Sequence, residues 1–328
     1  MRKRSLLCEN IIGKPIIEAN YADICFYDKE NDNKIIVSSS SINEKDYPLS
    51  KFTPIGIVAV PSSHTEENRP RIASLAEMNF NTPDSGNVIS HQYLYWGGYG
   101  YIITNLPTKN QYPFLERNPN NFTEDSTVGF INNPIYLASD DFSGHVKNPL
   151  NSLEGFYYSN TSYYYMCSPY KEDESKEIRY FDSSNTGNVL ADFDGKTNTD
   201  LILEYDNSYS TDWQTASTIT DEGIERYVHP AAQCCWRYYT DGTNKGDWYL
   251  PSAGELGYIM ARQRSINLAI NILNTQYNKT LGLTLERVNY WTSTQYSSVY
   301  AVRLYLAFGL VGYTGKSNGG YVRAFLSL

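Results

Sequence analysis

The stretch GDWYLPSAGEL, from Gly246 to Leu256, decides how the second half of this chain folds. Pro251 ends a short apolar run, and Ser252 follows with Glu255 three residues later, which is the capping-box spacing at the start of a helix. Leu256, Ile259 and Met260 then repeat on one helical face and predict a buried stripe. Trp248 lies just before this helix and is expected to be a packing anchor, since one indole buries about 200 Å².

Helices and then strands are predicted on both sides of this stretch. Upstream, the apolar spacing between residues 221 and 239 predicts a helix that begins near His229, because Pro230 suits the first helical position. Downstream, a separate helix is expected at residues 265–274, and strands are expected at residues 290–293, 300–306 and 321–326. The pattern predicts an α+β fold with two to three helices on an antiparallel sheet.

The N-terminal part reads instead as short β runs separated by turns. Residues 22–27 and 34–37 predict a hairpin around Asp32-Asn33, and the apolar run at 55–60 predicts a buried strand. Residues 105–133 are rich in Asn, Pro and Thr and predict a long loop. We therefore expect a β-rich module for attachment or oligomerisation at 1–104, a loop-rich connecting region at 105–188 and a display domain at 189–328. The run Asp192-Phe193-Asp194-Gly195-Lys196 lacks the spacing of a calcium loop and is interpreted as a turn.

Composition narrows the class of function. The 328 residues carry a net charge of -9 with no basic stripe, which argues against nucleic-acid binding. Tyr occurs 30 times, and Tyr with Ser, Gly and Asn is typical of adaptable recognition surfaces, although Tyr also favours strands. Five scattered cysteines form no disulfide framework, and neither a secretory signal nor a membrane span is expected, so the sequence predicts a chain made in a reducing cytoplasm.

Three phrases in a fixed order carry a family resemblance: Gly246 to Leu256, Tyr290-Trp291-Thr292-Ser293-Thr294, and Tyr321-Val322-Arg323. Together they resemble the DUF1566 family, a branch of the C-type-lectin-like fold, over about residues 189–328. The resemblance implies helices packed on a twisted antiparallel sheet, with Trp248 and Trp291 in the core. Arg323 lies in an apolar strand and should be paired if buried, with Glu255 as the candidate partner.

A candidate ligand-binding surface follows from a further resemblance. Variable receptor-binding proteins of diversity-generating retroelements are similar to this chain and place changeable Tyr, Asn and Ser side chains on this part of the fold. The alternative is that these are ordinary strand and loop residues. The predicted ligand-binding residues are Gln295, Tyr296, Ser298, Tyr300, Arg303, Tyr305, Tyr313, Lys316 and Asn318.

Phrases at residues 51–58, 71–75 and 81–84 resemble virion and prophage proteins of gut Bacteroidetes, including crAss-like phages. The sequence thus predicts a non-enzymatic phage structural or fibre protein on the virion. Its expected partners are a host receptor or glycan, or a neighbouring virion protein. A homo-oligomer is also expected in the particle, with a trimer as one option.

Two alternatives stay open. One is a bacterial cell-surface adhesin or glycan-binding lectin. The other is an oxidase of the formylglycine-generating type, which would need reactive thiols at Cys234 and Cys235, two neighbours on a predicted helix. No cofactor or metal is expected, because His64, His91, His145 and His229 are scattered.

Overall fold

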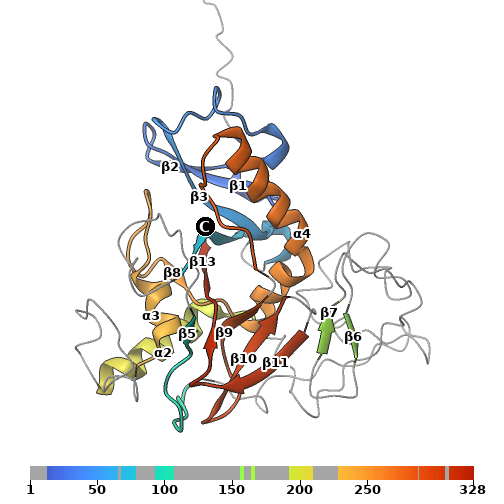
Figure 1. Ribbon diagram of the computed structural model, residues 1–328. Helices are drawn as coiled ribbons and strands as arrows, with labels where there is room; N and C mark the ends of the chain where they lie inside the picture. The colour runs from blue at the N-terminus through green and yellow to red at the C-terminus, as the bar shows by residue number, and fades with distance from the viewer. Residues whose placement is uncertain are drawn as a thin grey trace, which may run out of the picture.

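The computed structural model describes residues 13–65, 68–78, 93–106, 156–158, 164–166, 192–209, 228–286, 288–306 and 310–328. These residues form an α+β fold, as the sequence predicts, with sheets flanked by helices (Figure 1). The N-terminal strands and short 3-10 helices are η1 Ile16–Glu18, β1 Ile24–Asp28, β2 Asn33–Val37, η2 Ser39–Ser41, β3 Phe52–Val60, η3 Ser62–His64, β4 Arg71–Glu77 and β5 Leu94–Tyr95. The later elements are β6 Phe156–Tyr158, β7 Tyr164–Met166, α2 Gly195–Tyr209, α3 Pro230–Arg237, β8 Trp248–Tyr249, α4 Ala253–Gln276, β9 Asn289–Gln295, β10 Tyr300–Tyr305, β11 Leu310–Gly315, β12 Gly319–Gly320 and β13 Arg323–Ser327.

One six-stranded sheet joins the beginning and the end of the chain. Its strand order is β2-β1-β3-β4-β13-β8, so the C-terminal strand β13 pairs directly with β4 of the N-terminal part. Phe325 lies opposite Ala73 on one side and opposite Tyr249 on the other. The segments expected as separate units at 1–104 and 189–328 therefore share a sheet, and no sheet boundary separates them.

A second sheet has the order β6-β7-β11-β10-β9. Its strands β6 and β7 come from the region expected to be a loop-rich connector, and they extend the sheet because β7 pairs with β11 and β6 pairs with β7. The residues around these two strands, including most of 105–188, lie outside the described part. So do residues 81–84, which carried part of the virion resemblance.

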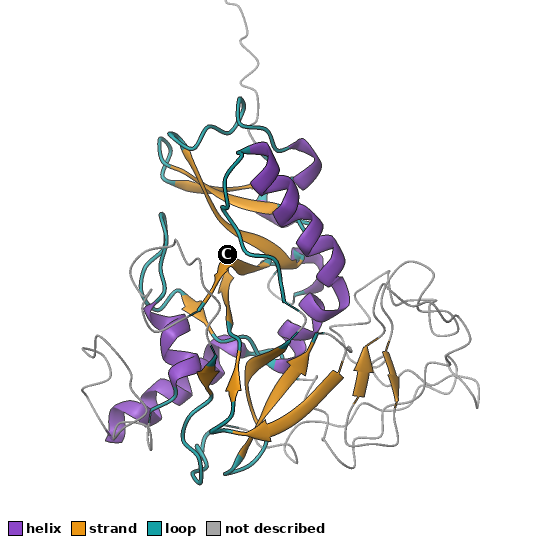
Figure 2. Cartoon of the chain, in the orientation of Figure 1, coloured by secondary structure: helices purple, strands orange, loops and turns teal. Residues whose placement is uncertain are grey.

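The helices lie on both faces of the six-stranded sheet (Figure 2). On one face, α4 packs with Phe26, Tyr249 and Phe325 in a core that continues to the second sheet. On the other face, α2 and α3 pack with Trp248 and other residues in a second core. The sheet is therefore covered on both sides, which explains why β4 is buried along its whole length and β3 is buried from Ile55 to Val60.

The predicted start of α4 is confirmed in detail. The Ser252 amide donates to the Glu255 carboxylate at 2.9 Å, and the Ser252 hydroxyl accepts from the Glu255 amide at 3.4 Å. The predicted break before residue 265 is wrong, because α4 is one 24-residue helix. It continues through polar residues because they have partners: the Arg262 guanidinium lies 4.4 Å from the Tyr21 ring, and Gln263 donates to the Leu285 carbonyl.

Helix α3 begins where Pro230 predicts, with His229 as its N-cap. Helix α2 begins within the run expected to be a turn at 192–196: residues 192–194 are not helical, and Gly195 and Lys196 belong to the helix. The Asp194 carboxylate accepts from the Thr197 amide at 3.2 Å and so caps this helix. Half of its buried stripe is polar, with Asn198, Thr199 and Asp206 fully or nearly buried, so a search for apolar periodicity does not detect it.

The tryptophans are buried, as the sequence predicts. Trp248 and Trp291 have no solvent exposure. The Trp248 indole donates to the Thr243 hydroxyl at 3.1 Å, and that of Trp291 donates to the Leu94 carbonyl at 2.8 Å. Both rings therefore satisfy their one polar group inside the protein.

Arg323 is buried and paired, but its expected partner is wrong. Its guanidinium donates to the Glu77 carboxylate at 2.9 Å and to the carbonyls of Ser74 and Leu283. Glu255 instead accepts from the Tyr249 hydroxyl and lies 3.4 Å from the Arg71 guanidinium. The pairing of β4 with β13 brings Glu77 opposite Arg323, and the sequence does not reveal that pairing.

Candidate functional site

The nine predicted ligand-binding residues divide into three groups by exposure. Tyr300 and Asn318 are exposed, and Ser298, Arg303, Tyr305 and Tyr313 are partly exposed, whereas Gln295, Tyr296 and Lys316 are buried. Gln295, Tyr296 and Lys316 are therefore not available to a ligand at the outer surface. Ligand binding by the other six residues stays a prediction.

Gln295 fastens a distant segment of chain to the end of β9. Its amide group donates to the carbonyls of Ile103 and Leu106, both at 3.2 Å, and its carbonyl oxygen accepts from the Ile103 amide at 3.1 Å. These bonds satisfy backbone groups that would otherwise be buried without partners. Gln295 therefore fixes the position of residues 103–106.

Lys316 also binds the segment that contains residues 101–106, through the Tyr101 backbone. Its ammonium group donates to the Tyr101 carbonyl at 2.8 Å and to the Gln295 side-chain oxygen at 3.1 Å, and it lies 4.5 Å from the centre of the Trp96 ring. These partners are all neutral, and burial lowers the pKa of Lys316 to about 7. We call Gln295 and Lys316 the loop clamp.

Tyr296 is the core of an aromatic cluster. Its ring stacks on that of Tyr313, with centroids 4.0 Å apart and planes 13° apart, and Tyr300 packs edge-on against Tyr313 at 5.3 Å. Burial raises the pKa of Tyr296 above its usual value. Tyr296 thus supports the more exposed rings of Tyr300 and Tyr313.

The clamped segment adds two exposed side chains, Tyr99 and Ile102, that the sequence analysis missed. Tyr99 is 54% exposed and Ile102 is 46% exposed, compared with 41% for Tyr300. The Gly100 amide donates to the Ser298 carbonyl at 2.9 Å, which places this turn beside the β9–β10 connection. We use the name aromatic platform for the exposed and partly exposed residues of this turn and of the neighbouring hairpin, namely Tyr99, Ile102, Ser298, Tyr300 and Tyr313.

Glycines explain the shape of this turn. Gly97, Gly98 and Gly100 all have positive φ, and a side chain on Gly97 would lie 2.1 Å from the Val228 carbonyl. The sequence Gly97-Gly98-Tyr99-Gly100 therefore forms a tight turn. What the sequence did not indicate is that this turn lies beside residues some 200 positions later.

Arg303 and Tyr305 do not join the platform. They alternate along β10 with Val302 and Leu304, which are buried in the core that contains α4. Tyr313 lies opposite Val302 in the β10–β11 pair, whereas Arg303 lies opposite Gly312. Because neighbouring side chains point to opposite faces of a sheet, Arg303 and Tyr305 lie on the other face from Tyr313.

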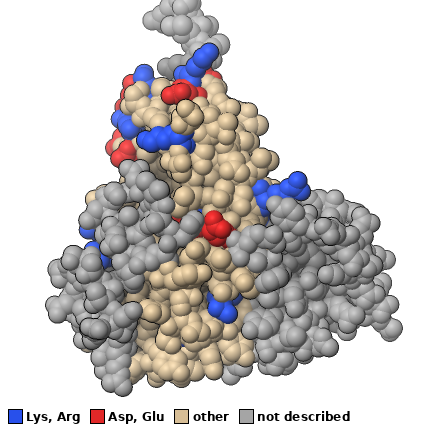
Figure 3. All heavy atoms as spheres, viewed as in Figure 1, with Lys and Arg blue, Asp and Glu red and all other residues tan. Residues whose placement is uncertain are grey.

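Charge is unevenly distributed over the visible face. In Figure 3 the charged side chains gather over the end that contains β1–β3 and are sparse over the end that contains β9–β11. The platform itself contains no charged residue. It is therefore suited to contacts through rings and hydroxyl groups rather than through ion pairs.

Comparison with known proteins identifies no family. No protein-family model matches the chain, and no curated protein is similar to it. Among solved structures, the chain is similar to a fimbrial protein from Bacteroides ovatus ATCC 8483, with a TM-score of 0.40 and 15% identity. That match covers 94% of this chain and 49% of the other, so this chain spans about half the length of that protein. Similarity at this level establishes neither a shared fold nor a shared function.

The thiols do not have the character of catalytic residues. Cys234 and Cys235 are buried and unbonded, and burial raises the pKa of Cys234 to about 12. A thiol of this kind is almost never in the reactive thiolate form near neutral pH. Among the described residues, no three His, Cys, Asp or Glu side chains gather as metal ligands, and no helix has the length and apolar character needed to cross a membrane. Cys8 and Cys167 lie outside the described part.

Proposed function

We propose that this chain is a non-enzymatic binding protein that presents the aromatic platform to a ligand on another surface. The observation that carries the proposal is the combination of exposed rings with a buried clamp that fixes the segment next to Tyr99. Burying a lysine among neutral partners is costly, yet Lys316 is buried at the one place where it fixes the turn that carries Tyr99.

Exposed aromatic side chains that are held rigidly favour ligand binding. Aromatic side chains already held in place lose little conformational entropy when a ligand arrives, which increases affinity. Tyr296 and the loop clamp supply that rigidity from below, and Ser298 supplies polar groups at the rim. The ligand is a host receptor or glycan, or a neighbouring protein of the same particle.

The finer setting we propose is a phage particle, with residues 189–328 related to the C-type-lectin-like DUF1566 domains and the whole chain part of a homo-oligomeric fibre. The phrases at 51–58 and 71–75 support this setting through their resemblance to virion proteins. A bacterial cell-surface adhesin is the alternative setting for the same platform. Electron microscopy of purified phage particles labelled with an antibody to this chain separates the two, since the virion setting requires label on the particles.

Binding by the platform is tested with intact cells. The full chain is labelled with a fluorophore and its binding to a panel of gut bacteria is measured by flow cytometry. On the strain that binds, Tyr300→Ser and Tyr99→Ser are each expected to weaken binding at least tenfold. Tyr93→Ser is the matched control, because Tyr93 is 56% exposed but lies outside the platform. Equal binding by all four proteins would contradict the proposal.

A further inference from the structure

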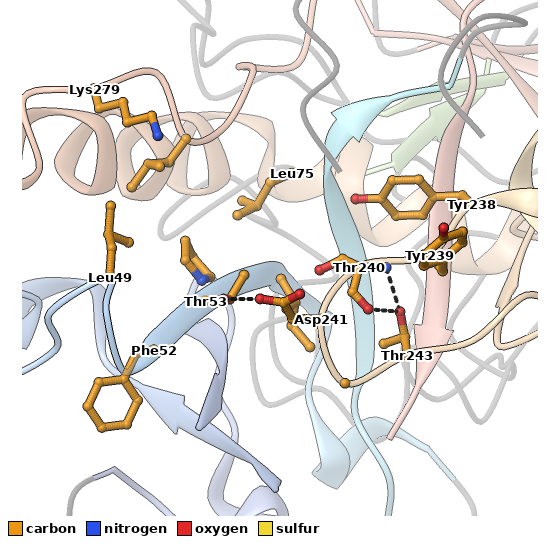
Figure 4. Close-up of a pocket in the computed structure, with 14 residues that line it drawn as sticks. Leu49, Phe52, Thr53, Leu75, Tyr238, Tyr239, Thr240, Asp241, Thr243 and Lys279 are labelled. Atoms are coloured by element: carbon orange, nitrogen blue, oxygen red, sulfur yellow. Dashed lines mark hydrogen bonds between the residues drawn. The ribbon is translucent and has the colours of Figure 1, made fainter. Parts of the chain in front are cut away.

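A groove separate from the platform lies between the start of β3, the turn at residues 238–243 and the segment that follows α4. It encloses about 570 Å³, within the range of sites that bind small ligands. Figure 4 shows Lys279 and Leu49 on one side, with Thr240 and Asp241 on the other. The groove residues that the argument uses are Leu49, Thr53, Tyr239, Asp241, Lys279 and Leu281.

The turn that carries Asp241 is held rigidly. The Thr243 hydroxyl accepts from the Trp248 indole at 3.1 Å and from the Thr240 amide at 2.8 Å, so the turn is tied to the core. Gly242 has a φ of +71°, and a side chain there would lie 2.2 Å from the Tyr27 ring. Asp241 is thus presented from a turn fixed on two sides, as expected for a pre-organised ligand contact.

The Asp241 carboxylate is only partly used within the protein. One of its oxygens accepts from the Thr53 hydroxyl at 2.6 Å and lies 3.7 Å from the Lys29 ammonium group. The side chain is 54% exposed. A ligand with hydroxyl groups can therefore donate to this carboxylate without displacing the bond to Thr53.

From this lining we infer that the groove binds a short oligosaccharide. A sugar offers hydroxyl donors for Asp241 and acceptors for the Lys279 ammonium group. Its C–H faces suit the apolar surfaces of Tyr239, Leu49 and Leu281, which are all partly buried. A groove of this size accommodates a few sugar units.

An added peptide strand fits the groove less well. The part of β3 that lines it contains Pro54, which has no backbone N–H to donate to another strand. The groove also shares no residue with the aromatic platform, and Figure 1 places β1–β3 and β9–β11 at opposite ends of the molecule. The sugar site is therefore additional to the proposed function, and the failure of one proposal does not contradict the other.

The inference is tested with the full chain on a printed array of purified oligosaccharides of two to six units, followed by calorimetric titration of the strongest binder. Asp241→Asn keeps an acceptor for Thr53 but removes the charge, and it is expected to lower affinity at least tenfold. Tyr239→Ser is a second groove variant with the same expected direction. Tyr93→Ser is the matched control, because Tyr93 is exposed and lies outside both the groove and the platform, and it is expected to bind within twofold of the unchanged chain. The platform variant Tyr300→Ser is measured beside these variants.

A loss with both groove variants and none with Tyr93→Ser supports the sugar site. No binder on the array overturns it, as does a binder whose affinity is unchanged by Asp241→Asn. A binder that depends on Tyr300 and not on Asp241 overturns the groove site while supporting the platform. Melting temperatures of the variants within a few degrees of the unchanged chain confirm that each variant is folded.

Discussion

Replacing the buried lysine of the loop clamp gives a prediction whose size follows from the structure. Lys316 is fully buried, and burial lowers its pKa from 10.5 to about 7. The unfolded chain therefore binds more protons at this site than the folded chain between these two values. By linkage, the free energy of unfolding then rises with pH across the same window.

The magnitude follows from the shift. One pKa unit corresponds to about 1.4 kcal/mol. With a folded pKa of about 7, the contribution of Lys316 to the free energy of unfolding rises by about 2 kcal/mol between pH 7 and pH 9. Lys316→Met has no titrating group and loses this dependence. The difference in stability between the unchanged chain and Lys316→Met should therefore shift by about 2 kcal/mol in favour of the unchanged chain over that range.

The assay is urea denaturation of both proteins at pH 7, 8 and 9. Comparing the two proteins cancels groups that titrate in both, such as Cys234 and Cys235, whose raised pKa values lower stability as pH rises. Lys279→Met is the matched control, because Lys279 is exposed. Hydrogen exchange gives a second readout, since amides of residues 101–106 should exchange faster when the clamp is broken. A stability difference that does not change with pH would refute the reasoning.

Four further changes have expected results. Trp291→Ala should lower the free energy of unfolding by about 3 to 5 kcal/mol, because it leaves a cavity in a fully buried site; urea denaturation measures it. Glu77→Gln should cost about 3 to 5 kcal/mol in the same assay, because it leaves the Arg323 charge buried without its counter-charge. Burial raises the pKa of Glu255 from 4.5 to about 7, so the folded state binds the extra proton, and stability should fall as pH rises from about 4.5 to 7; in the variant Glu255→Gln this slope should be absent. Tyr300→Ser should change stability by about 0.5 kcal/mol or less by thermal melting, since the ring is 41% exposed, and a larger loss would mean that the ring belongs to the core.

The sequence by itself determined the elements whose signals are local. The capping box at Ser252 and Glu255 and the proline at the start of α3 act through hydrogen bonds and dihedral angles within a few residues. The β1–β2 hairpin has its turn at Asp32, which adopts a φ of 51°. Burial of Trp248 and Trp291 also follows from the residue type, because so large an apolar surface is rarely left in water.

Only the tertiary structure decided how polar residues are used. Gln295 and Lys316 look in sequence like members of an exposed, adaptable surface, yet both are buried because they bond to backbone groups about 200 positions earlier. Arg323 has Glu77 as its partner for the same reason. A polar side chain can be buried only where a partner meets it, and that partner is supplied by strand pairings across the length of the chain, which no local pattern specifies. The position of the turn at Gly100 beside Ser298 has this origin too, so the sequence alone does not reveal the platform.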